Sequence, residues 1–427
     1  MDPNTPLSPS PKSFFAKNPS LLIVEFQRYL LLRLGIIFGL NMQITVIYFW
    51  VYQLTADKLS LGLVGLAEVI PAIGVSFFSG YVVDHNEKRK MVLACLSGYI
   101  ALALSLFFMA MAQPQIPTGW LVNLIYILVF LGGVLRSFYS PSMFALFGMV
   151  VPREHFPNAT TWSSMAWHLG AVLGPLAAGF GIAWKGIAPS LFVVFALLTS
   201  LLLPLLAIAS KPVIKKVKEP VLQSVVEGLA FVWKTPVLLS ALCLDMFSVL
   251  FGGAVALLPV YQKEILLVDE MGFGLLRSAP GIGALITMAL LAFLPLRTNP
   301  GRKLFFCVGG FAVSIIIFGI SKNFYLSMFM LLLSGMFDAV SVVIRSTILQ
   351  LVTPDAMRGR VSAVNTMFVS SSNELGDFES GVMAHWLGTV RAVVTGGCIT
   401  LGVVIYTYFR APQLRHFSFE HTRKENG

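Results

Sequence analysis

Five ionisable side chains lie close together in a part of the chain that is otherwise apolar. They are Asp338, Arg345, Glu374, Asp377 and Glu379, and they occupy two apolar segments that a short basic turn joins. A charge held in the middle of an apolar helix costs roughly 2.5–3.5 kcal/mol on membrane-insertion scales. We therefore expect these groups to have ionic partners, a water-filled cavity, or both.

Two spacings in this region point to proton chemistry. Asp338 and Arg345 lie two helical turns apart on one face, and Glu374 and Asp377 lie one turn apart. Two carboxylates one turn apart repel when both are ionised, which favours proton binding by one of them. Asp245 has no basic neighbour in sequence and is a further candidate. The predicted proton-coupling residues are Asp338, Glu374, Asp377 and Asp245; the alternative is that Arg345 neutralises one of these carboxylates in a static ion pair.

Several other polar side chains lie inside apolar segments and are candidates for the wall of a central cavity. For Arg136 the alternative is a structural arginine that binds backbone carbonyls, and for His168 it is ordinary hydrogen-bonded packing. Asn41 and Gln43, with the nearby Tyr48, offer hydrogen bonds and aromatic surface to a ligand. The predicted cavity residues are Arg136, Arg345, Asn41, Gln43 and His168.

The composition is that of a protein that crosses a membrane many times. The chain has 427 residues, of which 56% are hydrophobic and 12% charged, with a mean hydropathy of +0.81. Soluble domains are about 25% charged. About 20 apolar residues span a bilayer as a helix. We predict an all-α membrane protein with twelve transmembrane helices, at 29–53, 60–83, 90–112, 120–149, 160–184, 187–210, 236–261, 272–296, 303–321, 323–350, 361–386 and 389–409.

The basic residues predict the orientation of the chain. Most lysines and arginines fall in alternate loops and near both ends, which by the positive-inside rule makes those loops and both termini cytoplasmic. The net charge of +10 is explained by this pattern, so we expect no nucleic-acid partner. Arg277 is assigned to the opposite side. The four cysteines lie in apolar segments without metal-ligand spacing, and we expect no metal, cofactor or catalytic residue.

A basic linker divides the spans into six and six. The predicted units are a cytoplasmic tail at 1–27, a half at 28–210, a linker at 211–235, a half at 236–409 and a tail at 410–427. Residues 221–234 have helical apolar spacing, which indicates either an interfacial helix on the inner leaflet or an ordinary linker helix.

The two halves look like copies of one unit. Sliding the chain along itself aligns Pro152 with Pro354, Gly174 with Gly376 and Gly179 with Gly381. The same shift aligns Arg136 with Asp338, so these opposite charges are expected to face one cavity. Parallel repeats of this kind are a transporter architecture, with the substrate site between the halves near the midplane.

Two local motifs have both a structural and a functional interpretation. In the loop after the second span, a glycine permits close helix approach, an aspartate ends a helix and a basic cluster anchors the next one at the membrane edge; these residues are Gly80, Asp84, Lys88, Arg89 and Lys90. In the fifth span, small residues four apart allow close helix packing and a proline permits a kink; these are Gly170, Gly174, Pro175 and Gly179.

Both motifs resemble those of the major facilitator superfamily. The loop is similar to its cytoplasmic signature, and this implies that Asp84 and the basic cluster lock the halves together on the cytoplasmic side. The fifth span resembles its exporter motif, with Ala178 in place of the penultimate glycine. The run VVIRSTILQLVTPDAMRGRVSAVNTMF (342–368) and SNELGDFESG (372–381) resemble the branch of enterobactin exporters and macrolide efflux proteins.

This resemblance implies a secondary transporter of the bacterial inner membrane that works by alternating access. The expected function is proton-coupled export of a bulky small molecule, a siderophore or a drug. Import of a ferric siderophore or a nutrient by the same fold remains the alternative, because the sequence does not determine direction. The chain has no H-E-x-x-H, G-x-S-x-G or P-loop motif, so we expect no enzyme activity. The expected partners are the substrate, protons and the lipid bilayer, and nothing in the sequence points beyond a monomer.

Overall fold

The structure is a computed structural model, and it describes residues 18–210, 221–293, 299–354 and 357–418. Within these residues the chain is helical and has no strand. The first half has η1 (Pro19–Leu22), α2 (Val24–Thr55), α3 (Lys58–His85), α4 (Lys88–Met111), η2 (Gln113–Gln115), α5 (Thr118–Val150), η3 (Arg153–His155), α6 (Phe156–Lys185), α7 (Ile187–Ser200) and α8 (Leu202–Leu206).

The second half is also built of helices. It has α9 (Val221–Lys234), α10 (Pro236–Gly252), η4 (Val255–Leu257), α11 (Leu258–Val260), η5 (Tyr261–Ile265), α12 (Glu270–Phe293), α13 (Pro300–Ile320), α14 (Phe324–Val352), α15 (Arg358–Leu387), α16 (Thr389–Arg410) and α17 (Pro412–Arg415).

The prediction of an all-α membrane protein with twelve spans is confirmed. Eleven described segments are long and apolar enough to cross a membrane. The twelfth predicted span is α15, a helix of 30 residues whose charged side chains lower its mean hydropathy. Its neighbours α3 and α10 pack against it along the bundle, so those charges lie in the interior rather than toward lipid.

Two of the predicted spans are interrupted, at a proline in the first case and at two glycines followed by a proline in the second. The sixth is divided into α7 and α8 because Pro204 has no N–H to donate to the carbonyl of Ser200. The seventh leaves α-helical geometry at Gly252 and Gly253 and continues through η4, α11 and η5. There Pro259 likewise has no N–H to donate to the carbonyl of Val255, so this carbonyl can accept a hydrogen bond from a side chain.

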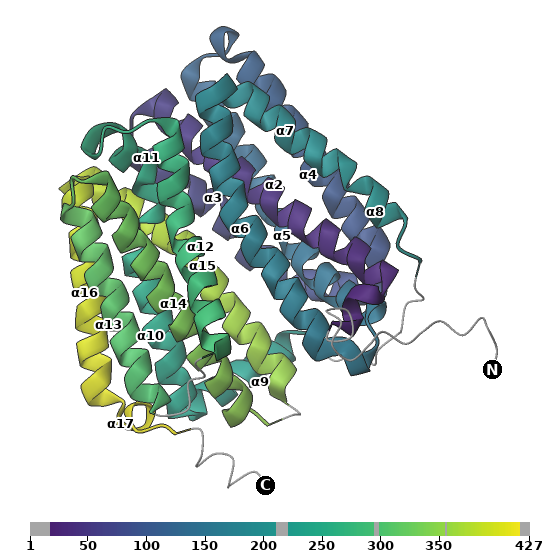
Figure 1. Cartoon of the computed structure of the whole chain (residues 1–427), viewed down its shortest axis with the longest axis vertical. Coiled ribbons are helices and arrows are strands. Elements are labelled where there is room, and N and C mark those ends of the chain that lie inside the picture. The colour runs from purple at the N-terminus through teal and green to yellow at the C-terminus, as the bar shows by residue number, and fades with distance from the viewer. Residues whose placement is uncertain (1–17, 211–220, 294–298, 355–356, 419–427) are drawn as a thin grey trace.

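The helices form two groups that meet through two crossings. Within the first half α2 packs on α6 and α7, and α3 and α4 pack on α5; within the second, α14 packs on α12 and α13, and α16 on α10 and α13. The halves are joined chiefly by α3 against α15 and α6 against α12. In Figure 1 the two groups lie closest near α11 and diverge toward α9 and the beginning of α2.

Both crossings depend on glycine. A Cβ atom on Gly381 would lie 2.6 Å from the Cα of Gly62, and one on Gly179 would lie 2.7 Å from the Cα of Gly274. Backbones that approach this closely leave no room for a side chain, which is the usual role of small residues in membrane helix packing.

The predicted tails are partly ordered. Residues 19–22 form η1 and α2 already begins at Val24, because Ser20 is fully buried and hydrogen-bonded to Asn158 of α6. Residues 1–17, 211–220 and 419–427 lie outside the described part of the chain, so the predictions for them stay untested. The expected helix after the linker is α9, which packs on α15 through Gly228 and an ion pair between Glu227 and Arg360.

Gly335 of α14 offers a direct test of the packing in the second half. A Cβ atom there would lie 1.9 Å from the carbonyl oxygen of Pro280 on α12. We expect Gly335→Ala to reduce stability by about 1–3 kcal/mol, since a backbone atom cannot move aside as a side chain can. The matched control is Gly402→Ala on α16, where no atom lies within 4 Å. Melting curves in detergent should show a lower transition temperature for the first variant and an equal or higher one for the second; equal effects would contradict this packing.

Candidate functional site

A cavity of about 450 Å³ lies between the two halves. Its wall comes from α2, α3, α5 and α6 on one side and from α10, η4, α12 and α15 on the other. Small-molecule sites typically have volumes of about 300–1,000 Å³ and combine an apolar lining with a few polar groups. This cavity fits that description, because Ile37, Leu40, Ile44 and Trp167 supply apolar surface beside charged residues of both signs.

Arg136 forms an ionic link between the halves. Its Nη1 lies 2.6 Å from Oε1 of Glu68 on α3 and 2.6 Å from Oε1 of Glu374 on α15. The second carboxylate oxygen of Glu374, Oε2, is buried and has no hydrogen-bond partner among the described residues. One oxygen of Glu374 is therefore held by a cation, while the other is a position that a proton can occupy.

Three further cavity residues contact one another in the order Asp377, Tyr48 and Arg277. The hydroxyl of Tyr48 donates to Oδ2 of Asp377 at 2.6 Å. The guanidinium carbon of Arg277 lies 4.9 Å from the centre of the Tyr48 ring, which is a cation–π geometry. Tyr48 thus stands between an acid on α15 and a cation on α12, both in the second half, although it belongs to α2 in the first.

Asp245 and Asp338 lie apart from this cavity, in the interior of the second half. Asp245 of α10 pairs with Arg345 of α14, and both are almost fully buried. Asp245, Asp338 and Ser341 line a void of about 10 Å³, the size of one water molecule. The four predicted proton-coupling residues therefore divide between two places, with Glu374 and Asp377 in the large cavity.

The expectation that Arg136 and Asp338 face one cavity is wrong. Arg136 has its partners on α3 and α15, whereas Asp338 lies within the second half. Arg345 is also not in the wall of the large cavity, because it is drawn to Asp245.

Two more predicted cavity residues lie elsewhere. Asn41 lines the cavity and donates to the carbonyl of Ile37 at 2.8 Å, but Gln43 is about 200° farther around α2 and does not line it. His168 is also outside the wall; it lies edge-on to its neighbour Trp167, whose side chain does reach the cavity. In both cases a residue one or two positions along the same helix points away from the cavity.

Glu68 and Arg277 also line the cavity, although neither is among the residues predicted from the sequence to do so. Glu68 lies in an apolar span, and its only signal was that position. Arg277 was counted as a flanking cation because it follows the beginning of α12 closely. The sequence does not show how deep Arg277 lies in the bundle. The start of α12 lies at the end of the bundle where the halves meet, and seven residues of helix carry the chain about 10 Å inward from there.

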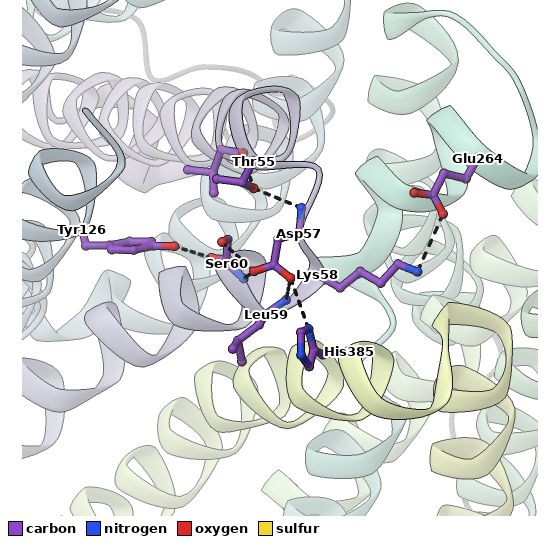
Figure 2. Close-up of polar contacts among 9 residues, drawn as sticks. Thr55, Asp57, Lys58, Leu59, Ser60, Tyr126, Glu264 and His385 are labelled. Carbon is purple, nitrogen blue, oxygen red and sulfur yellow. Dashed lines mark hydrogen bonds and ion pairs between the residues drawn. The ribbon is translucent and has the colours of Figure 1, made fainter. Parts of the chain in front are cut away.

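Polar contacts close the bundle at one end, which we call the closed end and define by Asp57, Lys58, Glu264 and His385. Figure 2 shows Lys58 of α3 reaching toward Glu264 of η5, with 3.8 Å between Nζ and Oε2. Tyr52 of α2 donates its hydroxyl to the same Glu264. His385 of α15 lies 3.3 Å from Oδ1 of Asp57 (Figure 2). Each of these contacts joins one half to the other.

Asp57 also caps α3. Its carboxylate accepts hydrogen bonds from the backbone N–H groups of Leu59 and Ser60 and from the Ser60 hydroxyl. Partial burial acts to raise the pKa of Asp57, but these hydrogen bonds and that of His385 outweigh it, so the pKa is lowered. The stability that these hydrogen bonds to the ionised Asp57 carboxylate supply is therefore fully present above the ordinary pKa of aspartate. It is lost as the pH falls through the lowered pKa.

The predicted gate loop lies at the other end of α3. Lys88 is buried and donates to the carbonyls of Val83 and Asn86, Arg89 donates to the carbonyl of Leu206, and Lys90 lies 3.3 Å from Glu87. A Cβ atom on Gly80 would meet nothing within 4 Å. The side chain of Asp84 is outside the described residues, so its predicted lock with the second half is not tested.

The predicted packing motif of the fifth span lies on two different contacts. Cβ atoms on Gly170 and Gly174 would come within 2.9 Å and 2.7 Å of backbone atoms of Phe38 in α2. Gly179, one turn beyond Pro175, contacts α12 of the second half. The motif therefore lies at a contact within the first half and at a crossing between the halves.

Comparison with known proteins identifies related sequences. The family model described as Major Facilitator Superfamily matches residues 7–376. The enterobactin exporter EntS of Escherichia coli (strain K12) is 26% identical over 348 residues, which cover 79% of this chain and 80% of that protein. EntS of Shigella boydii serotype 18 is 26% identical over 336 residues, covering 76% and 77%.

Solved structures share the fold at low sequence identity. A bacterial homologue of the human lysosomal transporter Spinster, inward-facing and unoccupied, has a TM-score of 0.68 and 15% identity, covering 92% of this chain and 99% of its own. An inward-facing bacterial homologue of the iron transporter ferroportin has 0.68 and 18%, covering 91% and 99%. A D-xylose–proton symporter has 0.70 and 13%, covering 95% and 100%.

The ionic link at Arg136 predicts a measurable coupling. Arg136→Gln leaves two carboxylates without their cation, and we expect a loss of about 1–3 kcal/mol, less than the 3–5 for a fully buried pair, because the Arg136 side chain is 41% exposed to the cavity. Adding Glu374→Gln should restore part of the loss, since it removes one unpaired charge. Melting temperatures of the wild type, both single variants and the double variant form a cycle. Additive effects would mean that the two residues do not interact.

The closed end predicts a change in the distance between the halves. Glu264→Ala removes an acceptor of Tyr52 and the ionic partner of Lys58, so the closed end should separate more often. Spin labels at Trp120 and Trp386, one in each half and both exposed, on a background without native cysteines, would report this as a longer and broader distance distribution. Glu154→Ala, at an exposed glutamate of η3, is the control. An unchanged distribution in the Glu264 variant would contradict a role in closure.

Proposed function

The chain belongs to the Major Facilitator Superfamily, whose members are membrane transporters rather than enzymes, and from that premise we propose that it exports a bulky small molecule in exchange for protons by alternating access. The observation that carries the proposal is the cavity of about 450 Å³ between the halves, with carboxylates of α15 in its wall. We propose the bacterial inner membrane as its location, with both termini cytoplasmic.

Glu374 is the carboxylate that we assign to proton coupling first. It belongs to the second half but its Oε1 pairs with Arg136 of the first half, and its Oε2 has no donor among the described residues. A proton on Glu374 weakens its ion pair with Arg136 and so weakens one link between the halves. Protonation and the movement of the halves are therefore coupled through a single bond.

Asp377 is the second carboxylate of the proposed pathway. It lies one turn from Glu374 and accepts the hydrogen bond of Tyr48, again from the other half. The predicted roles of Asp245 and Asp338 remain part of the proposal as an internal proton site of the second half, where Arg345 balances one of the two charges.

Two features support export of a siderophore or a drug. The relatives named as enterobactin exporters cover most of the chain, and the cavity has room for a molecule with an apolar body and several polar groups. Import of a ferric siderophore or a nutrient by the same fold is the second candidate, because the fold alone does not determine direction. Similar structures include a protein named as a D-xylose–proton symporter.

Transport into everted membrane vesicles tests direction and coupling together. With an acidic interior, an exporter driven by proton exchange should accumulate its substrate inside the vesicles, and the accumulation should collapse when the pH gradient is removed. A gradient of one pH unit corresponds to about tenfold accumulation for each proton exchanged. Metal-free and ferric catecholate siderophores and macrolides form the first panel. Uptake by right-side-out vesicles instead would support import.

Glu374→Gln should separate coupling from binding. We expect it to reduce accumulation driven by the pH gradient at least tenfold, while downhill exchange of the same substrate continues. The reason is that glutamine keeps the shape of the side chain but cannot take up and release a proton. The control is Glu379→Gln on the same helix, whose side chain does not line the cavity. If both variants still concentrate substrate, proton coupling through Glu374 is wrong.

A further inference from the structure

Arg277 is a cavity cation whose donors are mostly unused. Its hydrogen bond to the carbonyl of Val255 is long, at 3.5 Å. Among the residues that the structure describes, no carboxylate oxygen lies within 4.0 Å of it. A guanidinium group has five N–H donors, so most of those of Arg277 are available to a molecule in the cavity.

The other arginines of the interior differ from Arg277. Arg136 has a carboxylate oxygen at 2.6 Å on each of two sides, and Arg345 is paired with Asp245. Breaking or omitting the partner of a buried charge is costly, because the charge has lost water without gaining a counter-ion. Arg277 bears part of this cost because the neighbours that contact it, the Tyr48 ring and the Val255 carbonyl, carry no charge, and a bound anion would relieve it.

Asp377 does not supply that counter-ion directly. It is held at the hydroxyl of Tyr48, whereas Arg277 lies over the ring face, so the aromatic ring separates the two charges. Because Pro259 has no N–H to donate, the carbonyl of Val255 is left to Arg277 and to the turn of η4. Ring and carbonyl orient the guanidinium group without neutralising it.

We infer that the cavity binds an organic anion, with its carboxylate or sulfonate group paired to Arg277 and its apolar body against Ile37, Leu40, Ile44 and Trp167. The planar fork of arginine matches such groups with two parallel hydrogen bonds. Trp167 is 42% exposed, which gives an aromatic body a surface to cover. This inference rests on the proposed transport function and specifies the class of its substrate.

A cationic substrate is the competing possibility, and it has a different place to bind. Glu68 and Glu374 share one cation, Arg136, so this group carries an excess of negative charge when both acids are ionised. A cation would bind there and would not need Arg277. The two classes of substrate are therefore distinguished by which side chain their binding requires.

Paired probes that differ only in charge test the inference. The acids are dansylglycine, 2-naphthoate and naphthalene-2-sulfonate, and their neutral counterparts are the corresponding amides and sulfonamide. Binding is measured on purified full-length protein in lipid nanodiscs at pH 7. We expect at least one acid to bind at least tenfold more tightly than its neutral counterpart.

Substitutions then assign the preference to Arg277. Arg277→Gln should weaken binding of the acid at least tenfold and change binding of the neutral probe less than twofold. Arg277→Lys should keep part of the preference, since it retains the charge but not the fork. The control is Arg391→Gln, at an exposed arginine of α16. Binding of the neutral probe and the melting temperature report whether each variant is folded.

Each result decides the inference. It is overturned if no acid is preferred, if Arg277→Gln keeps the preference, or if lipophilic cations bind and depend on Glu68 or Glu374 instead. Vesicle transport separates it from the proposed function. Acids that need Arg277 for binding but show no gradient-driven flux would leave the anion site standing and refute export, whereas gradient-driven flux of cations that Arg277→Gln does not change would leave export standing and refute the anion site.

Discussion

The bond from Arg136 to Glu68 and Glu374 is the interaction on which the arrangement of the two halves depends. A guanidinium group in the interior of an apolar bundle needs counter-ions, and here one comes from its own half and one from the other. The energetic demand of one charge therefore holds α5 and α15 at a fixed distance around the cavity. Closure at the end near α11 adds to this, through glycine crossings and the contacts of Glu264 (Figures 1 and 2).

This dependence makes the link between the halves sensitive to chemistry. Glycine contacts have no titratable group and remain whatever the pH, whereas an ion pair weakens when its acid takes a proton. The crossing of α3 and α15 combines both kinds of contact, because Gly65 lies against Asp377 and the backbone of Glu374. In the proposed alternating-access cycle both kinds of contact at this crossing have to break and re-form, and of the two only the ion pair responds to a proton.

The sequence predicted the helices well and the partners of the charges poorly, for one physical reason. Apolar length is local, so the spans and even the polar helix α15 could be recognised, whereas the breaks near Pro204 and Pro259 were not predicted. Which face of a helix meets the cavity depends on its rotation in the bundle, and this separated Asn41 from Gln43 and Trp167 from His168. The shared cavity expected for Arg136 and Asp338 failed similarly, since equivalent positions in two repeats need not face each other. Arg277 was not predicted to line the cavity, because a residue so near the beginning of α12 was expected to lie at the membrane surface.

Tyr48 connects the two chemical roles of the cavity. Its hydroxyl holds Asp377 and its ring supports Arg277, so a change at either charged group acts on the other through one rigid side chain. A proton on Asp377 reverses the hydrogen bond with Tyr48 or breaks it, which loosens a contact between α2 and α15. The proposed proton site and the proposed substrate site therefore share one side chain, and a change at either of them acts on the contact between α2 and α15.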